Sequence, residues 1–208
     1  MASASARCAV LLAALAMLAA SVAGCSKPPR VQTLAPDAIV LAFGDSLTFG
    51  TGANENESYP AQLSMLIGRK VVRAGVPGEV SREGLARLPE ALDEHQPRLV
   101  LLLHGGNDFL RRLPQSQTAE NLRAMIRLAK NRGADVLLIG TPEPGITVTP
   151  PDFYAAAAKE SGIPYEGAVI GKVLRNPAEK SDSIHPNAQG YRRIAERVAE
   201  VLKSSGAL

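Results

Sequence analysis

From Ile39 onward, the chain alternates short apolar runs with longer amphipathic stretches, and few folds accommodate that alternation. Each apolar run is bounded by glycine, proline or charged residues, which is typical of strands buried on both faces of a sheet. We predict strands at Ala38–Phe43, Lys70–Arg73, Leu99–Leu103 and Val136–Ile139, with a weaker fifth near Ile163–Tyr165. The pattern therefore predicts an α/β fold, a three-layer α/β/α sandwich around a mostly parallel five-stranded sheet.

Four amphipathic stretches between and after these runs predict helices that each bury one apolar face. They are Tyr59–Ile67, Ser81–Glu94, Thr118–Lys130 and about Asn187–Leu202. We expect Thr118 to be the N-cap of the third helix, because a threonine hydroxyl can accept from the first free backbone N–H groups. In sheets of this kind the functional site lies beyond the carboxyl ends of the strands, so polar motifs are expected directly after the apolar runs.

The first 24 residues are predicted to be an export signal and not part of the fold. Arg7 precedes an unbroken apolar run, Ala9–Ala20, which has the length of a signal peptide and is short for a membrane span. The following Val22–Cys25 resembles the lipobox of bacterial lipoproteins, which implies lipidation of Cys25; the plainer alternative is a signal peptide cut nearby. Residues 25–36 would then be a lipidated N-terminus and extended tether, and residues 37–208 the domain. We expect a chain exported to the bacterial cell envelope, lipid-anchored and facing the periplasm.

Charge and cysteine content exclude several classes of protein. The 208 residues carry 23 Lys and Arg against 20 Asp and Glu, a balance too even to indicate a nucleic-acid surface. Both cysteines, Cys8 and Cys25, precede the domain, which excludes a disulfide or a thiolate metal site within it. The histidines, His95, His104 and His185, show no metal-ligand spacing, so neither a metal nor a cofactor is expected.

Small and polar residues gather directly after the predicted strands. Gly44–Leu47 follows the first run, Ala74–Gly78 the second and His104–Asp108 the third. Ser46 would begin a helical turn at the end of its strand, where backbone N–H groups and the helix dipole favour a nucleophile. Taken singly, each motif has a plainer interpretation as a turn or a helix cap.

A further motif, Asp182–Asn187, precedes the last predicted helix. Asp182 lies three residues before His185 and can accept the Nδ1–H of its ring, which leaves Nε2 free to take a proton from a hydroxyl. The plainer interpretation is a helix cap beside a solvated histidine. His95 and His104 lack such a partner in the sequence.

Together, and in this order, the four motifs resemble the signature blocks of the SGNH (GDSL) hydrolase family. The resemblance spans roughly Ala38–Ser205 and looks closest to the bacterial arylesterases and multifunctional thioesterase/lysophospholipases of that family. It implies a flavodoxin-like sheet and a metal-free mechanism with three catalytic residues: Ser46 as nucleophile, His185 as general base and Asp182 as its orienting partner. It also implies an oxyanion hole made by the backbone N–H groups of Ser46 and Gly75 and by the side chain of Asn107.

The resemblance implies a serine esterase that hydrolyses short-to-medium acyl or aryl esters, with lysophospholipids and acyl thioesters as further substrates. An O-acetylesterase acting on envelope carbohydrate or peptidoglycan is the alternative, and a catalytically silent binding module is a third hypothesis. The expected partners are a small-molecule or lipid ester and, through the lipid anchor, a membrane; we expect a monomer. The loops Phe109–Leu113 and Ile146–Phe153 either line an acyl pocket or pack onto the domain. Arg73 departs from the asparagine of many relatives, so the packing beside Gly75 is expected to differ.

Overall fold

The structure is a computed structural model that describes residues 29–145 and 148–208. The predicted export signal, Cys25 and the first residues of the tether lie outside the described residues. No helix within the described ranges is long and apolar enough to cross a membrane.

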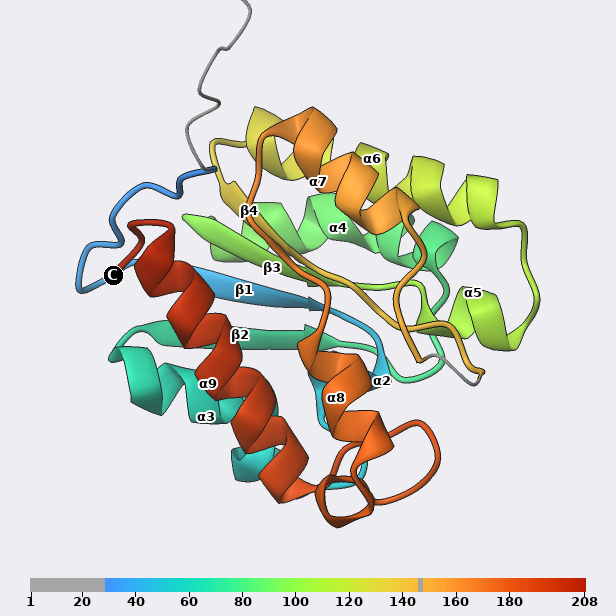
Figure 1. Cartoon of the computed structure of the whole chain (residues 1–208). Coiled ribbons are helices and arrows are strands. Elements are labelled where there is room, and N and C mark those ends of the chain that lie inside the picture. The colour runs from blue at the N-terminus through green and yellow to red at the C-terminus, as the bar shows by residue number, and fades with distance from the viewer. Residues whose placement is uncertain (1–28, 146–147) are drawn as a thin grey trace, which may run out of the picture.

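A five-stranded sheet forms the middle layer, and every strand pair in it is parallel. Its strands lie in the order β2-β1-β3-β4-β5 (Figure 1). Their bounds are Ile39–Gly44 for β1, Lys70–Gly75 for β2, Leu99–Leu103 for β3, Asp135–Ile139 for β4 and Tyr165–Glu166 for β5. The predicted architecture and the parallel sheet are thus confirmed, with the fifth strand placed slightly later than expected.

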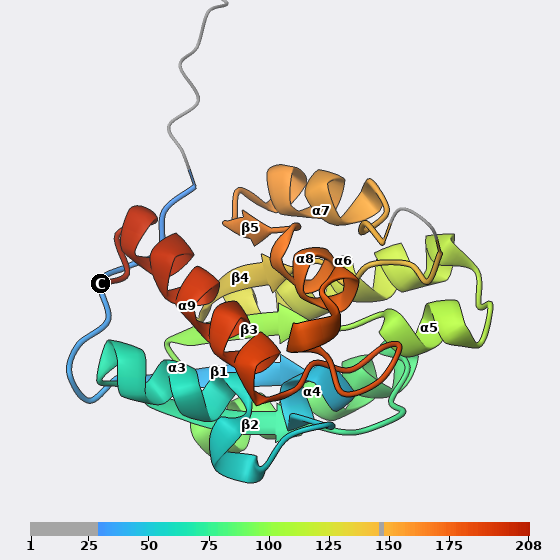
Figure 2. The same ribbon diagram turned by 60° about the horizontal axis from the view of Figure 1, so that its bottom comes forward.

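Helices cover both faces of this sheet (Figures 1 and 2). One face carries α3 (Tyr59–Ile67), α8 (Val169–Arg175) and α9 (Ala188–Ser204). The other carries α4 (Ser81–His95), α6 (Gln115–Asn131) and α7 (Phe153–Ser161). Shorter helices lie in the connections: α2 (Ser46–Phe49), α5 (Gly106–Leu110) and the 3₁₀ turns Glu55–Glu57 and Pro177–Glu179.

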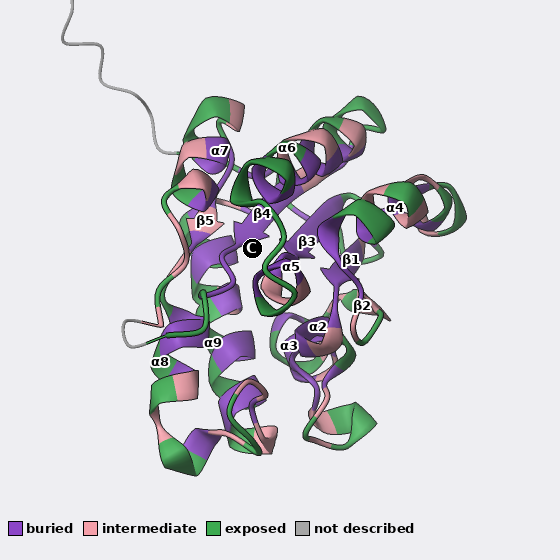
Figure 3. Ribbon diagram, turned by 90° about the vertical axis from the view of Figure 1, so that its right-hand side faces the viewer, coloured by how far each residue is buried: buried purple, intermediate pink, exposed green. Residues whose placement is uncertain are grey.

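Alternate residues of each strand supply two separate cores. Val40 and Ala42 pack toward α3 and α9, whereas Leu41 and Phe43 pack toward α4 and α6. This is the period of two expected of a strand buried on both faces. Figure 3 shows the result, with buried strands at the centre and helices whose exposed surfaces face outward.

The structure corrects one sequence-based prediction and adds three short helices. The third predicted helix begins earlier, at Gln115, so Thr118 lies inside α6 and is not its N-cap. Its buried hydroxyl instead donates to Asp108 Oδ1 at 3.1 Å, a partner on α5 that local sequence does not reveal. The short helices α5, α7 and α8 are not among the four helices predicted from sequence.

The segment before β1 belongs to the domain from Val31 onward, which shortens the predicted tether. Val31 and Leu34 are each 4% exposed and join the core beneath α9. Their backbone N–H groups donate to Ser205 and Ala207 at the end of that helix, at 3.0 and 2.8 Å. The chain therefore enters the domain at the amino ends of the strands, opposite the ends at which α2 and α5 begin (Figures 1 and 2).

Candidate active site

Ser46 lies where the strand order of the sheet reverses. β1 is flanked by β2 on one side and β3 on the other, so the connections leaving β1 and β3 diverge to opposite faces and open a crevice between them. Ser46 begins α2 directly after β1, as expected. Asp45 holds this turn, because its carboxylate accepts from Leu47 N at 3.0 Å and its carbonyl accepts from Thr48 N and Phe49 N. Burial raises the pKa of the Asp45 carboxyl above its ordinary value.

The structure brings Ser46, His185 and Asp182 together as a hydrogen-bonded chain. His185 Nε2 lies 3.1 Å from Ser46 Oγ, and His185 Nδ1 lies 2.8 Å from Asp182 Oδ2. A carboxylate can only accept, so Nδ1 carries the proton and Nε2 presents its lone pair to the serine hydroxyl. This is the arrangement in which a histidine can take the proton of a nucleophilic serine.

Backbone N–H groups fix Asp182 in front of the ring. Its Oδ1 accepts from Ile184 N at 2.8 Å and from His185 N at 2.7 Å, so both oxygens are engaged. Partial burial acts to raise the pKa of Asp182, but the hydrogen bonds from the His185 ring and these N–H groups outweigh it, and the pKa lies below its ordinary value. The carboxyl is therefore ionised at neutral pH, and its side chain is 52% exposed.

Asn107 shares the pocket of Ser46 and His185, whereas Gly75 does not line the described part of it. Asn107 Nδ2 donates to the carbonyl of Glu79 at 3.0 Å, which uses one of its two amide hydrogens; the other has no partner among the residues that the structure describes. Gly75, at the end of β2, packs against α2. A Cβ built at this position would lie 2.2 Å from Phe49 N and 2.6 Å from the Thr48 carbonyl carbon, so only glycine fits.

A cavity of about 500 Å³ opens beside the Ser46 hydroxyl. Its walls are mainly apolar and include Leu47, Leu110, Pro142, Val148, Leu174 and Ile184, with Thr141 and Lys180 among its polar residues. The two loops considered in the sequence contribute one wall residue each, Leu110 and Val148. Their aromatic residues pack onto the domain instead: Phe109 is buried, and Phe153 stacks on Tyr154 with 4.6 Å between ring centroids. Ile146 and Thr147 lie outside the described residues.

His104 has an acidic partner, contrary to the expectation from sequence. Its Nε2 lies 2.9 Å from Glu79 Oε2, and both side chains are buried. The two residues are 25 positions apart on different connections, so no local spacing reveals the pair. His95, by contrast, has only a loose contact of 3.8 Å with its neighbour Glu94. Within the described ranges, no three His, Cys, Asp or Glu side chains gather to hold a metal ion.

Arg73 packs beside the site and contacts α2 and the turn that follows it. Its guanidinium donates to the carbonyl of Phe49 at 2.7 Å, lies 4.7 Å from the centroid of that ring and pairs with Glu55 at 2.8 Å. The arginine therefore ties the edge strand β2 to the last residue of α2.

A doubly wound parallel sheet with a Ser–His–Asp chain at its switch point defines a serine hydrolase. A model of the GDSL-like lipase/acylhydrolase family matches residues 42–193, and the chain belongs to this family.

Two known proteins to which the chain is similar are named a thioesterase/protease/lysophospholipase and an esterase. It is 34% identical over 172 residues to thioesterase 1/protease 1/lysophospholipase L1 of Escherichia coli, covering 79% of this chain and 83% of that protein. It is 32% identical over 200 residues to esterase TesA of Pseudomonas aeruginosa, covering 90% and 98%. A crystal structure of TesA superposes with a TM-score of 0.70 at 30% identity, covering 80% of this chain and 99% of that one. The carboxylic ester hydrolase class expected from the sequence fits these relatives.

Proposed function

We propose that this chain is a serine esterase that hydrolyses short-to-medium acyl or aryl esters through an acyl-enzyme on Ser46. Lysophospholipids and acyl thioesters are further substrates in this proposal. The observation that carries it is the hydrogen-bonded chain from Ser46 Oγ through the His185 ring to Asp182 Oδ2, with bonds of 3.1 and 2.8 Å beside an apolar cavity.

The catalytic cycle follows from this geometry. Ser46 Oγ attacks the ester carbonyl carbon while His185 Nε2 takes the hydroxyl proton, and Asp182 stabilises the resulting imidazolium. His185 then gives that proton to the leaving oxygen or sulfur, and the acyl group stays on Ser46. Water next attacks the acyl carbon and loses a proton to the same Nε2. The bond between that carbon and Ser46 Oγ then breaks, Ser46 Oγ takes the proton back from His185, and the acid leaves.

The tetrahedral intermediate places a negative charge on the former carbonyl oxygen. The second amide hydrogen of Asn107 and the backbone N–H groups of Ser46 and Gly75 are the donors proposed for it. Asn107 lies in the pocket with Ser46, which supports its part in this hole. Removing one such donor typically lowers kcat by about 10²–10³.

The shape and chemistry of the cavity support the substrate class. Its volume of about 500 Å³ and its apolar walls suit a chain of several carbons or an aryl ring, and an acetyl group would leave most of it unfilled. A relative from Vibrio mimicus, 32% identical over 174 residues, is named an arylesterase. Both points favour the esterase over the carbohydrate O-acetylesterase.

Hydrolysis of p-nitrophenyl esters from acetyl to palmitoyl tests this function, with Ser46→Ala as the matched control. We expect turnover to peak between butyryl and octanoyl and to be lost in Ser46→Ala, which should unfold at the same temperature as the wild type. Activity confined to acetyl would favour the O-acetylesterase instead. No turnover at any length, together with no labelling of Ser46 by a fluorophosphonate, would favour the binding module.

We also propose that the chain is exported and anchored in the bacterial envelope by lipid on Cys25, facing the periplasm. Val22–Cys25 and the apolar run before it support this location. A diacylglyceryl group supplies two acyl chains, which is what stable anchoring requires. Metabolic labelling with a palmitate analogue should mark the wild type and not Cys25→Ala, and labelling of neither would leave a plain signal peptide.

A further inference from the structure

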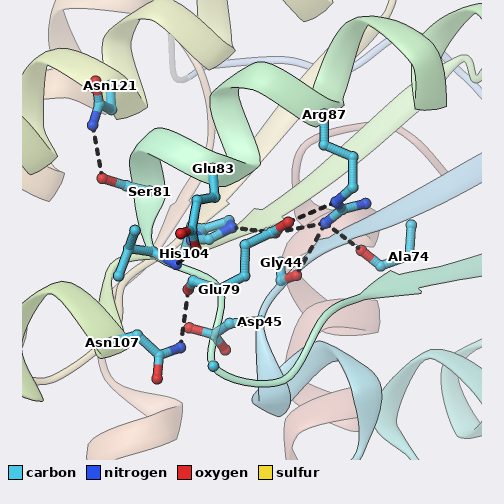
Figure 4. A network of polar contacts seen from close by, with 12 residues as sticks. Gly44, Asp45, Ala74, Glu79, Ser81, Glu83, Arg87, His104, Asn107 and Asn121 are labelled. Carbon is cyan, nitrogen blue, oxygen red and sulfur yellow. Dashed lines mark hydrogen bonds and ion pairs between the residues drawn. The ribbon is translucent and has the colours of Figure 1, made fainter.

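A buried polar network lies behind Asn107, between the ends of β1, β2 and β3 (Figure 4). Its members are Glu79, Arg87 and His104, here called the Glu79 network. None of them lines the cavity, as far as the described residues go, and the catalytic cycle does not use them. Glu79 and His104 are buried, whereas Arg87 is partly exposed. A buried carboxylate so near the site needs a physical explanation, because removing a charged group from water is costly.

The Glu79 carboxylate lies at the centre of this network and is 6% exposed. Arg87 donates to both of its oxygens, each at 2.7 Å, and His104 Nε2 donates to Oε2 at 2.9 Å. Burial acts to raise the pKa of Glu79, but the hydrogen bonds and charges of Arg87 and His104 lower it to about 2. The group is therefore a carboxylate at neutral pH.

Arg87 connects this carboxylate to two strand ends. Its Nη2 lies 3.4 Å from the carbonyl of Gly44 and 3.3 Å from that of Ala74. These carbonyls directly precede Asp45, which caps the Ser46 turn, and Gly75. The guanidinium also lies 4.1 Å from the centroid of the Phe43 ring, so its position is fixed from above as well as in its plane.

His104 connects the carboxylate to the third strand end. It directly precedes Gly105, Gly106 and Asn107, and its own carbonyl accepts from Tyr154 Oη at 2.7 Å. The ring is fully buried against α4, where a Cβ at Gly84 would lie 2.3 Å from Nε2. The ring therefore has no freedom to follow Glu79 if that side chain moves.

The main chain of Glu79 contacts the active site itself. Its carbonyl accepts from Asn107 Nδ2 at 3.0 Å, and its N–H donates to the carbonyl of Val76 at 3.2 Å, which closes the turn after Gly75. A carboxamide is planar, so one hydrogen bond donated by Nδ2 sets the direction of the second Nδ2–H. The position of the Glu79 carbonyl thus determines where Asn107 points.

We propose that Glu79 is a positioning residue of the oxyanion hole: its carboxylate, held by Arg87 and His104, fixes the carbonyl that aims the Asn107 amide at the developing negative charge. The proposal rests on the proposed role of Asn107 as an oxyanion donor. It accounts for a charged network beneath a site whose chemistry needs a preorganised donor and not a mobile one.

The test is a double-mutant cycle of Glu79→Gln and Asn107→Ala in the full chain, measured with p-nitrophenyl butyrate. Glutamine keeps the shape of the side chain but has one carbonyl oxygen in place of two carboxylate oxygens. Its NH₂ group would therefore face an N–H donor of Arg87 or His104. We expect Glu79→Gln to lower kcat by about 10–10² with KM within twofold, and Asn107→Ala to lower it by about 10²–10³. The double variant should be no slower than Asn107→Ala alone, because the first change acts through the second residue.

Two results would overturn the proposal. One is a double variant slowed by the product of the two single effects, which would show that Glu79 acts independently of Asn107. The other is an equal loss of kcat in Glu166→Gln, the matched control. Glu166 is likewise a buried carboxylate, 3% exposed, and accepts from Arg197 at 2.5 Å, but it lies on β5 at the opposite edge of the sheet.

A readout that does not need turnover separates this proposal from the proposed esterase function. The side-chain NH₂ resonances of Asn107, assigned by their absence in Asn107→Ala, should show one proton protected from exchange in the wild type. Glu79→Gln should shift that signal and increase its exchange rate at least tenfold, and an unchanged signal would refute the positioning role even in an inactive enzyme. If Glu79→Gln does not fold, Arg87→Lys takes its place in both experiments, because one ammonium cannot reach both carboxylate oxygens and the two carbonyls.

Discussion

Replacing Gly75 with alanine tests how closely the two strand ends of the site must approach. The backbone of β2 lies directly against α2 at this point, and a methyl group would meet three backbone atoms. It would lie 2.2 Å from Phe49 N, 2.6 Å from the Thr48 carbonyl carbon and 2.7 Å from the Asp45 carbonyl oxygen. None of these atoms can rotate away as a flexible side chain can.

The expected magnitude follows from these distances. Ordinary van der Waals contact for a Cβ begins at 3.4 Å, so α2 must move from β2 by about 1 Å. Such a shift carries Ser46 away from His185 Nε2, which lies 3.1 Å from its hydroxyl. A misplacement of about 1 Å lowers turnover by about 10²-fold, and overpacking of this kind costs about 1–3 kcal/mol of unfolding free energy.

The assay compares kcat for p-nitrophenyl butyrate and urea unfolding of Gly75→Ala with those of Gly68→Ala. Gly68 ends α3 with a φ of 62°, and a Cβ there meets nothing within 4 Å. Its replacement should cost about 1 kcal/mol through backbone strain and leave kcat unchanged. A Gly75→Ala enzyme with kcat within twofold of the wild type would refute the argument that this contact sets the position of the nucleophile.

Three further predictions concern single side chains. Asp182→Asn should lower kcat by about 10³–10⁴ with little change in melting temperature, because an amide turned toward His185 Nδ1 favours the wrong tautomer; steady-state kinetics would contradict this if the loss stayed below tenfold. Arg73→Ala should lower the unfolding free energy by about 1 kcal/mol in urea and leave kcat within a few-fold, because the lost contacts to Phe49 hold the back of α2 and not its catalytic end. Glu79→Gln should be less stable than the wild type at pH 7 by about 2–4 kcal/mol. The pKa of Glu79 is lowered from 4.5 to about 2, so this contribution is complete above pH 4.5 and lost as the pH falls toward 2. The unfolding free energies of the wild type and Glu79→Gln, measured by denaturation across this pH range, should therefore converge toward pH 2. A difference that stays constant with pH would count against the ion pair.

The sheet and the catalytic chain are predictable from sequence because each depends on local pattern. An apolar run such as Leu99–Leu103 is buried on both faces, and its five consecutive apolar residues contain no polar or turn-forming residue that would indicate another structure. Asp182 and His185 share one loop, so their hydrogen bond needs no knowledge of the fold. Ser46 follows the first strand, and parallel topology alone brings strand ends to one edge of the sheet.

The contacts missed from sequence join separate elements of the fold. Thr118 satisfies its hydroxyl at Asp108 on α5, so its capping preference was overridden by a tertiary hydrogen bond. His104 pairs with Glu79 across the interval between two strands, and the pair becomes visible only when β1, β2 and β3 are placed side by side. The absence of an acidic residue near a histidine in the sequence therefore says little about whether its ring has a partner in the fold.

The entry of the chain at the amino ends of the strands limits which esters a tethered enzyme can reach. Only five residues separate Cys25 from Val31, where the fold begins, and that length spans at most about 20 Å when fully extended. A domain of this size is roughly 40 Å across, so a lipid on Cys25 would hold the mouth of the cavity away from its own bilayer. Such an enzyme would draw its substrates from the aqueous space or from a facing layer. Inserting about 20 Gly and Ser residues after Arg30 would let the domain turn over, and hydrolysis of esters embedded in the anchoring vesicle should then rise.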